Sequence, residues 1–201
     1  AMGGADALGA IKTLRLTGDQ RALVNNLRAG QLSASKPLSV EYRVGLPDRF
    51  FFVHGWPNSG GRTTGGFVGK TTIKADLKEA EQLMGYLIFP LFLITDSAFR
   101  FNLVGIQGNS LQFQDRDGGA VFLELDPAND LPNRIRYTPR DYRSGRPEER
   151  IQEIGDFRPV GKLLLPHKLT AGEPTVRALG MGLYFSKIEI NPALTEMDFK
   201  K

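Results

Sequence analysis

Short β-prone segments separated by turn dipeptides dominate the second half of the chain, and this pattern limits the possible folds more than any other feature. Segments 99–107, 110–116 and 119–126 are separated by Gly108-Asn109 and Asp117-Gly118. Both dipeptides suit two-residue hairpin turns, because they tolerate the positive φ angles that such turns need. Hairpins at short intervals, with no helix between the strands, predict an antiparallel meander rather than βαβ units.

Apolar and polar residues alternate in other parts of the chain as well, which predicts half-buried strands. The alternating or strongly β-prone segments are 12–18, 37–44, 50–53, 134–138, 150–157, 162–169 and 176–190. A short helix is predicted over 6–11. One large antiparallel sheet with one apolar face is the simplest structure for these strands. The predicted fold class is therefore mainly β with some helix (α+β).

Segment 77–94 departs from the β pattern. Its first half has the composition and spacing of an amphipathic helix, and 83–94 is apolar throughout and contains Pro90. This apolar run is too short to span a bilayer, which needs about 20 residues, and Pro90 would kink or end a helix. We therefore predict no transmembrane span. We expect a curved antiparallel sheet with this helical segment buried against its apolar face.

The length and composition of the chain suit a single globular domain. Its 201 residues fit one domain, predicted over 5–201, whereas residues 1–4 (Ala-Met-Gly-Gly) resemble a cloning remnant and are left out of the predicted domain. The absence of cysteine excludes a disulfide framework, a thiolate nucleophile and a cysteine metal site.

The charge distribution gives no sign of a nucleic-acid partner. The formal net charge is +4, and seven arginines lie within 134–158, where acidic residues are interspersed with them. This mixture indicates a solvated strand face, and no nucleic-acid recognition module is found.

The glycine-rich stretch 60–72, GGRTTGGFVGKTT, is similar to the end of a phosphate-binding loop. That loop needs a glycine where this chain has Thr64, and it leads directly into a helix. Neither condition is met, so a mobile glycine-rich loop is the better interpretation.

Catalytic chemistry has few candidate residues. Only His54 and His167 could serve as an imidazole base or ligand, and the sequence has no Gly-x-Ser-x-Gly elbow. Two isolated histidines are too few for a zinc site, and Glu148-Glu149 in a turn is typical of solubilising surface. We predict no catalytic residue, no metal ligand and no cofactor.

His167 itself is better explained by structure than by chemistry. It alternates in phase with Leu163, Leu165 and Leu169, so it faces the apolar side of its strand. Pro166 cannot donate a ladder hydrogen bond, which favours an edge position or a bulge. We expect one ring nitrogen to bond the backbone of a neighbouring strand.

The aromatic and apolar residues at inward positions can form a core or line an apolar cavity, because binding pockets are mostly hydrophobic. The residues predicted to line such a cavity are Val40, Tyr42, Phe52, Trp56, Tyr86, Phe89, Phe113, Leu123 and Tyr137.

Two motifs in the last third of the chain resemble a known protein group. The stretch 156–167 is similar to the pattern D-[YF]-R-x-V-x-G-x-x-L-P-H, with matches at Asp156, Phe157, Arg158, Leu165, Pro166 and His167 and with Gly161 one residue before the pattern's glycine. The stretch 185–199 fits I-x-x-I-x-[VI]-N-P-x-L-x-x-x-x-F at Ile188, Ile190, Asn191, Pro192, Leu194 and Phe199. The chain thereby resembles the LolA/LolB-like superfamily of periplasmic lipoprotein carriers and their relatives.

This resemblance implies an incompletely closed antiparallel barrel that wraps helices and offers a hydrophobic concavity to acyl chains. It also implies export to the periplasm. The leading hypothesis is a non-enzymatic periplasmic protein that binds a lipid, an acyl chain or another apolar ligand in the concave face, in lipoprotein or lipid trafficking. The alternative is an interaction module with a filled core that docks an envelope protein partner. A third hypothesis is a hydrolase that uses His54 or His167.

Overall fold

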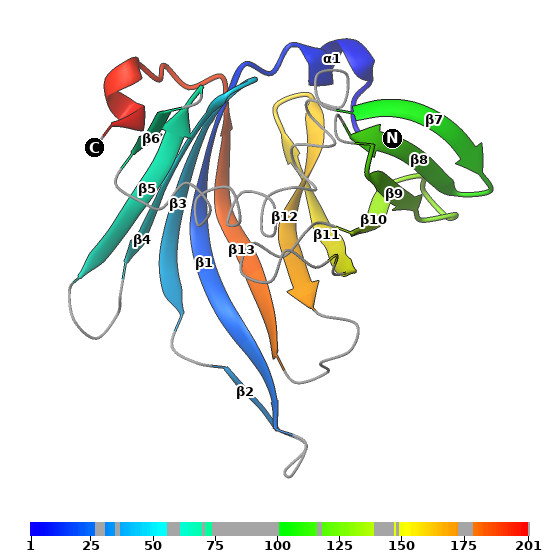
Figure 1. Cartoon of the computed structure of the whole chain (residues 1–201), viewed down its shortest axis with the longest axis horizontal. Helices are drawn as coiled ribbons and strands as arrows, with labels where there is room; N and C mark the ends of the chain where they lie inside the picture. The colour runs from blue at the N-terminus through cyan, green and yellow to red at the C-terminus, as the bar shows by residue number, and fades with distance from the viewer. Residues whose placement is uncertain are drawn as a thin grey trace.

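The protein forms one open, strongly curved antiparallel sheet (Figure 1). The computed structural model describes residues 1–26, 31–34, 37–55, 61–69, 71–73, 101–115, 118–138, 147, 149–172 and 179–200. In these residues the sheet has 13 strands and runs from β6 at one end to β7 at the other, so it is not closed into a barrel. The predicted fold class, mainly β with a curved antiparallel sheet, is confirmed.

The elements are α1 (Ala5–Gly9), β1 (Thr13–Asn26), β2 (Gln31–Ala34), β3 (Leu38–Gly45), β4 (Arg49–Gly55), β5 (Arg62–Val68), β6 (Thr71–Ile73), β7 (Phe101–Gln107), β8 (Ser110–Asp115), β9 (Ala120–Leu125), β10 (Pro132–Tyr137), β11 (Arg150–Val160), β12 (Leu163–Gly172), β13 (Leu179–Ile190) and the 3-10 helix η2 (Glu196–Phe199). The strand order is β6-β5-β4-β3-β1-β13-β12-β11-β10-β9-β8-β7, and β2 pairs with β1.

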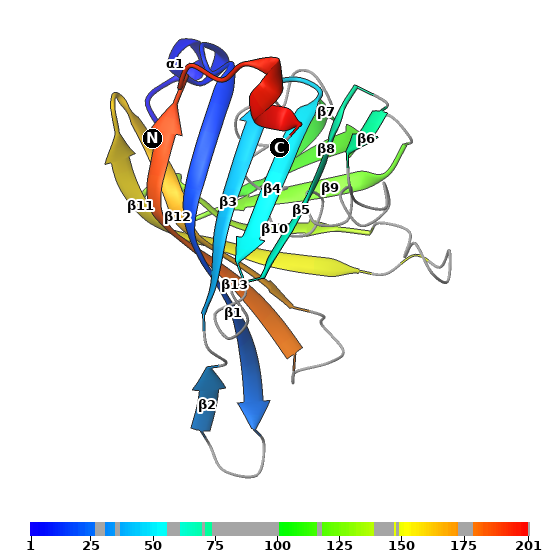
Figure 2. The ribbon, with the colours of Figure 1, turned by 90° about the vertical axis from the view of Figure 1, so that its left-hand side faces the viewer.

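The sheet consists of two antiparallel meanders, which are joined where β1, the first strand in the chain, pairs with β13, the last. β1 pairs with β13, so the β3–β6 arm and the β7–β12 arm lie on opposite sides of this pair. Figure 2 shows β7–β10 running behind β3–β5 at a steep angle, which makes the sheet's inner face concave. The predicted hairpin at Gly108-Asn109 joins β7 to β8, and Gly108 has a φ of 56°.

Asn191, from the Asn-Pro of the second motif, holds the junction of β1 and β13 together. Its Oδ1 accepts hydrogen bonds from the backbone N–H groups of Lys12 (2.7 Å) and Thr13 (3.2 Å). Its Nδ2 donates to the Ala10 carbonyl at 3.0 Å, and its φ of 51° turns the chain out of the strand. Asparagine tolerates this backbone region better than most residues.

Replacing Asn191 by alanine is expected to lower the free energy of unfolding by about 2–3 kcal/mol, because three side-chain hydrogen bonds are lost and alanine is strained at positive φ. Asn191→Gly is the matched control, since glycine tolerates the positive φ and removes only the side-chain hydrogen bonds. Urea unfolding should place the control between the wild type and Asn191→Ala. Equal stability of all three proteins would contradict the assigned role.

The residues of the first motif lie on the neighbouring strands β11 and β12, where they pair with one another. Phe157 pairs with Pro166 and Arg158 with Leu165, while Asp156 takes a φ of 53°. β12 pairs with β13 only from Lys168 onward, so Pro166 lies where this side of β12 has no ladder partner in the described residues. Pro166, predicted at an edge or a bulge, thus lies in an internal strand, at a point where one side of that strand lacks a ladder partner in the described residues. Arg158 donates to the Asp156 carboxylate at 2.6 Å, and the same contact lowers the pKa of that carboxyl.

His167 is buried, as its phase predicted, but its predicted partner was wrong. Its Nδ1 lies 3.1 Å from the Leu165 carbonyl oxygen, which belongs to the same strand and not to a neighbouring one.

The prediction of a glycine-rich loop over 60–72 was also wrong, because this stretch contains β5 and β6. Gly66 pairs with Phe51 in the neighbouring strand, and a Cβ on Gly66 would lie 2.1 Å from the Phe50 carbonyl oxygen. Its missing side chain permits close approach of the two backbones, while the threonines and Phe67 around it favour extended structure. Gly69, with a φ of 59°, turns the chain between the two strands.

The outer face of the β3–β5 arm has a small core of its own under η2. Phe51 and Phe199 are both fully buried, and η2 contacts β4 and β5. The Arg43 guanidinium lies over the Phe51 ring, and its Nη1 donates to the Asp198 carbonyl at 2.7 Å. Arg49 lies over the Phe199 ring.

The stretch 1–4, which the predicted domain leaves out, contains a buried residue. Met2 is buried in the core, and its carbonyl accepts a hydrogen bond from Leu164 N–H, so part of the stretch 1–4 packs with the sheet. The domain over 5–201 stays a prediction.

The helix over 77–94, with its apolar half 83–94, lies outside the described residues. In the described part of the chain, no helix has the length and apolar character needed to cross a bilayer.

Candidate functional site

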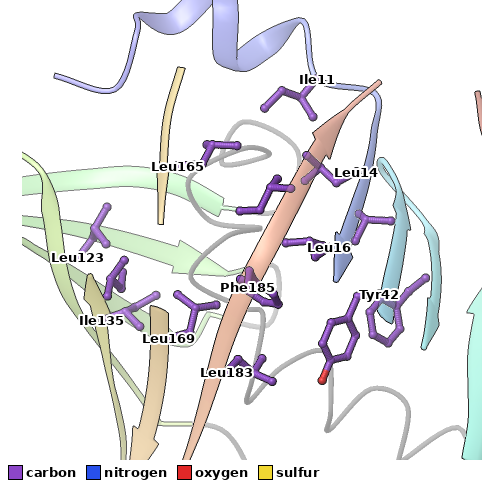
Figure 3. Packing of buried hydrophobic residues seen from close by; sticks show 14 of the residues in the cluster. Ile11, Leu14, Leu16, Tyr42, Leu123, Ile135, Leu165, Leu169, Leu183 and Phe185 are labelled. Atoms are coloured by element: carbon purple, nitrogen blue, oxygen red, sulfur yellow. The ribbon is translucent and has the colours of Figure 1, made fainter. Parts of the chain in front are cut away.

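The inner face of the sheet, defined here as the face that carries the main hydrophobic cluster, is the candidate site. Alternate residues of both arms point to it, and Figure 3 shows Leu123, Ile135 and Leu169 gathered on the same side of the sheet as Phe185 and Leu16. The buried strand residues of this cluster are Leu14, Leu16, Val40, Tyr42, Val44, Phe50, Phe52, Phe67, Phe101, Phe113, Val121, Leu123, Ile135, Tyr137, Ile154, Leu163, Leu165, Leu169, Leu183, Phe185 and Ile188.

Six of the nine residues predicted to line a cavity lie in this cluster. They form two groups, one on each arm of the sheet: Val40, Tyr42 and Phe52, and then Phe113, Leu123 and Tyr137. The other three, Trp56, Tyr86 and Phe89, lie outside the described residues. The structure thus places the six on one apolar face, while their role in ligand binding stays a prediction.

The register aligns the apolar residues of this face into rows that cross several strands. One row runs from Ile106 through Leu111, Leu123 and Ile135 to Gln152, one residue on each strand from β7 to β11. Paired residues of neighbouring strands share a face, so these five side chains follow one another along the inner face. Exposure falls along the row from 69% at Ile106 to 0% at Ile135.

A second row starts at Leu103 and continues through Phe113 and Val121 to Tyr137. Leu103 is 53% exposed, while the next three residues are buried. Leu103 and Ile106 therefore form an exposed apolar lip at the β7 end of the inner face. We use this name, the apolar lip, for these two residues below. Sequence alternation alone does not reveal it, because the bulge between Leu103 and Gly105 shifts the phase within β7.

A buried hydrogen-bonded pair lies on the β3–β4 part of the inner face. The Tyr42 hydroxyl is 3.1 Å from His54 Nε2, and both residues are buried. Burial lowers the pKa of the His54 imidazole to about 4 and raises the pKa of the Tyr42 phenol, because the interior disfavours either charged form. Both groups are therefore neutral near pH 7, and each satisfies the other.

The histidines lack the partners that hydrolysis requires. A general-base histidine is normally oriented by a carboxylate and lies next to a nucleophile. His54 contacts a phenol and His167 a backbone carbonyl, and neither imidazole has a carboxylate hydrogen bond in the described part of the chain. The same residues contain no group of three or more potential metal ligands. The hydrolase hypothesis has no support in this geometry.

Gln152 is a buried polar residue of the inner face that sequence reasoning missed. It pairs with Ile135 of β10, is 1% exposed, and its Oε1 has no hydrogen-bond partner among the described residues. Its position two residues before Ile154 was a usable signal, because it places a carboxamide in phase with the buried apolar residues of β11.

The outer face of the β7–β12 arm is charged and solvated, as the mixture of arginines and acidic residues in 134–158 predicted. Arg134 lies 3.4 Å from the Glu124 carboxylate and 3.8 Å from that of Glu153, with its side chain 47% exposed. Arg136 lies over the Phe122 ring. Such exposed pairs contribute little to stability and leave the outer face open to water.

Comparison with known proteins identifies the fold. No family model and no curated protein matches the sequence. Among solved structures, a LolA superfamily protein from Nitrosomonas europaea aligns with a TM-score of 0.65 and 10% identity over 100% of this chain and 98% of its own. The chain has the LolA-like fold. A domain assigned to outer-membrane lipoprotein sorting, from Vibrio parahaemolyticus, has a TM-score of 0.55 and 12% identity over 96% of this chain and 92% of its own.

A DUF1329 family protein from Desulfovibrio piger aligns with a TM-score of 0.53 and 10% identity, covering 97% of this chain and 92% of its own. At such low identities the similarity establishes the LolA-like fold alone. It confirms the fold that the two C-terminal motifs indicated. Both motifs have structural roles in this chain: Asn191 joins β1 to β13, and the LPH stretch lies in the part of β12 that pairs with β11 but, in the described residues, not with β13.

Proposed function

We propose that this LolA-like protein is a non-enzymatic periplasmic carrier that binds an acyl chain or another apolar ligand on its inner face. The proposal draws on the fold and on the similarity to a structure assigned to outer-membrane lipoprotein sorting. A carrier needs an apolar surface that a ligand can reach from outside. It needs no catalytic group.

The continuity of the two apolar rows is the observation that carries this proposal. Each row begins at the exposed apolar lip and continues through neighbouring strands to fully buried residues. An acyl chain that enters at the lip can therefore keep apolar contact along its whole path. Burial of each methylene contributes about 0.8 kcal/mol, which offsets the intramolecular contacts that the incoming chain replaces.

The direct test is native mass spectrometry after gentle purification, followed by titration of the delipidated protein with a fluorescent fatty acid. We expect either a co-purified lipid mass or saturable uptake of the probe. A ligand-free protein that takes up no probe would contradict the proposal.

Substituting the apolar lip tests the path of entry. Ile106→Asp is expected to weaken fatty-acid binding by about tenfold or more, because a carboxylate replaces a side chain whose burial by the ligand contributes about 1.5 kcal/mol or more. Met197→Asp is the matched control, since Met197 is 54% exposed but lies on η2, which packs on β4 and β5. Equal affinity of both variants in the fluorescence titration would exclude the lip as the entry.

The exposed edge of the sheet favours a second candidate function, docking of an envelope protein. β7 ends the strand order, Val104 is 53% exposed, and the stretch 101–114 contains no charged residue. Uncharged edge strands accept an added strand from another chain. Val104→Lys should abolish recovery of a stoichiometric partner from an envelope extract while fatty-acid uptake is unchanged; loss of uptake alone would favour the carrier.

A further inference from the structure

The unpartnered oxygen of Gln152 lies within the apolar row that the carrier proposal uses. Gln152 is 1% exposed, and its Oε1 has no hydrogen-bond partner in the part of the chain that the structure describes. Its cross-strand neighbours are Ile135 on β10 and Ala171 on β12, and Ile154 follows two residues later on the same face. Within the row the carboxamide lies beside apolar side chains, and the nearest polar groups on the same face belong to the cross-strand pair Tyr137 and Arg150.

An orphaned acceptor of this kind costs about 1–3 kcal/mol, and native proteins keep few of them. The two buried histidines of the inner face avoid the cost: His54 bonds Tyr42, and His167 bonds the Leu165 carbonyl. A leucine or methionine at 152 would fill the same space at no such cost. A glutamine here indicates a partner that the described residues do not supply.

A partner for Oε1 must donate a hydrogen bond and fit between the apolar side chains of Ile135 and Ile154. Such a partner is an amphiphilic molecule. A bridging water would need two to four polar partners, and the nearest polar groups on this face belong to the cross-strand pair Tyr137 and Arg150. Selectivity among ligands separates these two cases.

We propose that the inner-face ligand carries a hydrogen-bond donor, a hydroxyl or amide N–H attached to an acyl chain, which binds Gln152 Oε1. This inference rests on the proposed carrier function and narrows its ligand class. Four strand spacings separate Ile106 from Gln152, or about 19 Å at ~4.8 Å per strand. The hydrocarbon between the donor and the apolar lip lies along the row, over Ile135, Leu123 and Leu111.

Chemically matched probes test this selectivity. Palmitamide and hexadecanol carry N–H and O–H donors, whereas methyl palmitate has a similar chain and only acceptors. A carboxamide oxygen accepts hydrogen bonds and cannot donate one, so the ester leaves Oε1 unpaired. Competition against a fluorescent fatty acid on the delipidated full chain should show about tenfold tighter binding of at least one donor probe than of the ester.

Gln152→Met provides the matched variant, because methionine keeps the length of the side chain and removes the carboxamide. It should bind the amide, the alcohol and the ester within about twofold of one another, and thermal unfolding should show an apo protein at least as stable as the wild type. The wild-type comparison needs no variant, so the inference stays testable if Gln152→Met fails to fold.

The possible outcomes separate the two proposals. A donor preference in the wild type that disappears in Gln152→Met supports the inference. Equal binding of all three probes by the wild type, or a preference that persists in the variant, overturns it and leaves the carrier function standing. If neither the three probes nor the fluorescent fatty acid binds, both proposals are overturned.

Discussion

Phe50→Ala is expected to lower the free energy of unfolding by about 3–5 kcal/mol, the usual cost of removing a buried phenylalanine. Phe50 is fully buried on the inner face, with its ring 6.0 Å from Tyr42 in a stacked arrangement, 6.2 Å from Phe52 and 5.9 Å from Phe67. Truncation removes one member of each of these three ring pairs. Urea unfolding of the purified variant measures the loss directly.

Phe51→Ala is a closely matched control, because it removes the same residue type from the neighbouring position on the opposite face. Phe51 is equally buried but lies under Arg43. Both variants should lose similar stability, and only Phe50→Ala should change fatty-acid binding. The apolar cavity that Phe50→Ala creates lies on the inner face and can accept part of an apolar ligand. Added fatty acid should therefore restore stability to this variant. Equal restoration of Phe51→Ala would place the ligand elsewhere.

The architecture was predictable from the sequence where local chemistry and tertiary structure agree. Gly108-Asn109 forms the hairpin that its backbone preferences favour, and the alternation around Val40 and Tyr42 matches their buried positions. Asn191 was recognised by its motif, and the structure adds the physical reason, a side chain that joins two strands far apart in sequence.

The site was less predictable, because its features depend on register and on neighbours distant in the chain. The apolar lip depends on a bulge in β7, and the orphaned Gln152 oxygen becomes evident only when its cross-strand neighbours are known. The strand β5 was missed because Gly66 weakens the local β signal while its close approach to β4 needs a glycine. Long-range packing overrides local propensity at such positions.

Acidification from pH 7 to pH 4 is expected to lower the free energy of unfolding by about 3 kcal/mol through His54 alone. Burial lowers the pKa of His54 from 6.5 to about 4 in the folded protein. Between these values the unfolded chain binds a proton that the folded chain excludes, so stability falls as the pH falls through this window. Each pKa unit corresponds to about 1.4 kcal/mol, which gives the stated magnitude.

His54→Gln isolates this contribution, because glutamine can still hydrogen-bond the Tyr42 hydroxyl and does not titrate. Urea unfolding at pH 7, 5.5 and 4 should show a steep decline for the wild type and a shallower one for His54→Gln. The carboxyl pKa values of Asp156 and Asp198 are lowered from the usual value of 3.8. The stability that these two carboxylates contribute is therefore lost as the pH falls below 3.8, outside the window of His54. Parallel pH curves for the two proteins would show that His54 is accessible to protons in the folded state, and that the inner face around Tyr42 admits water.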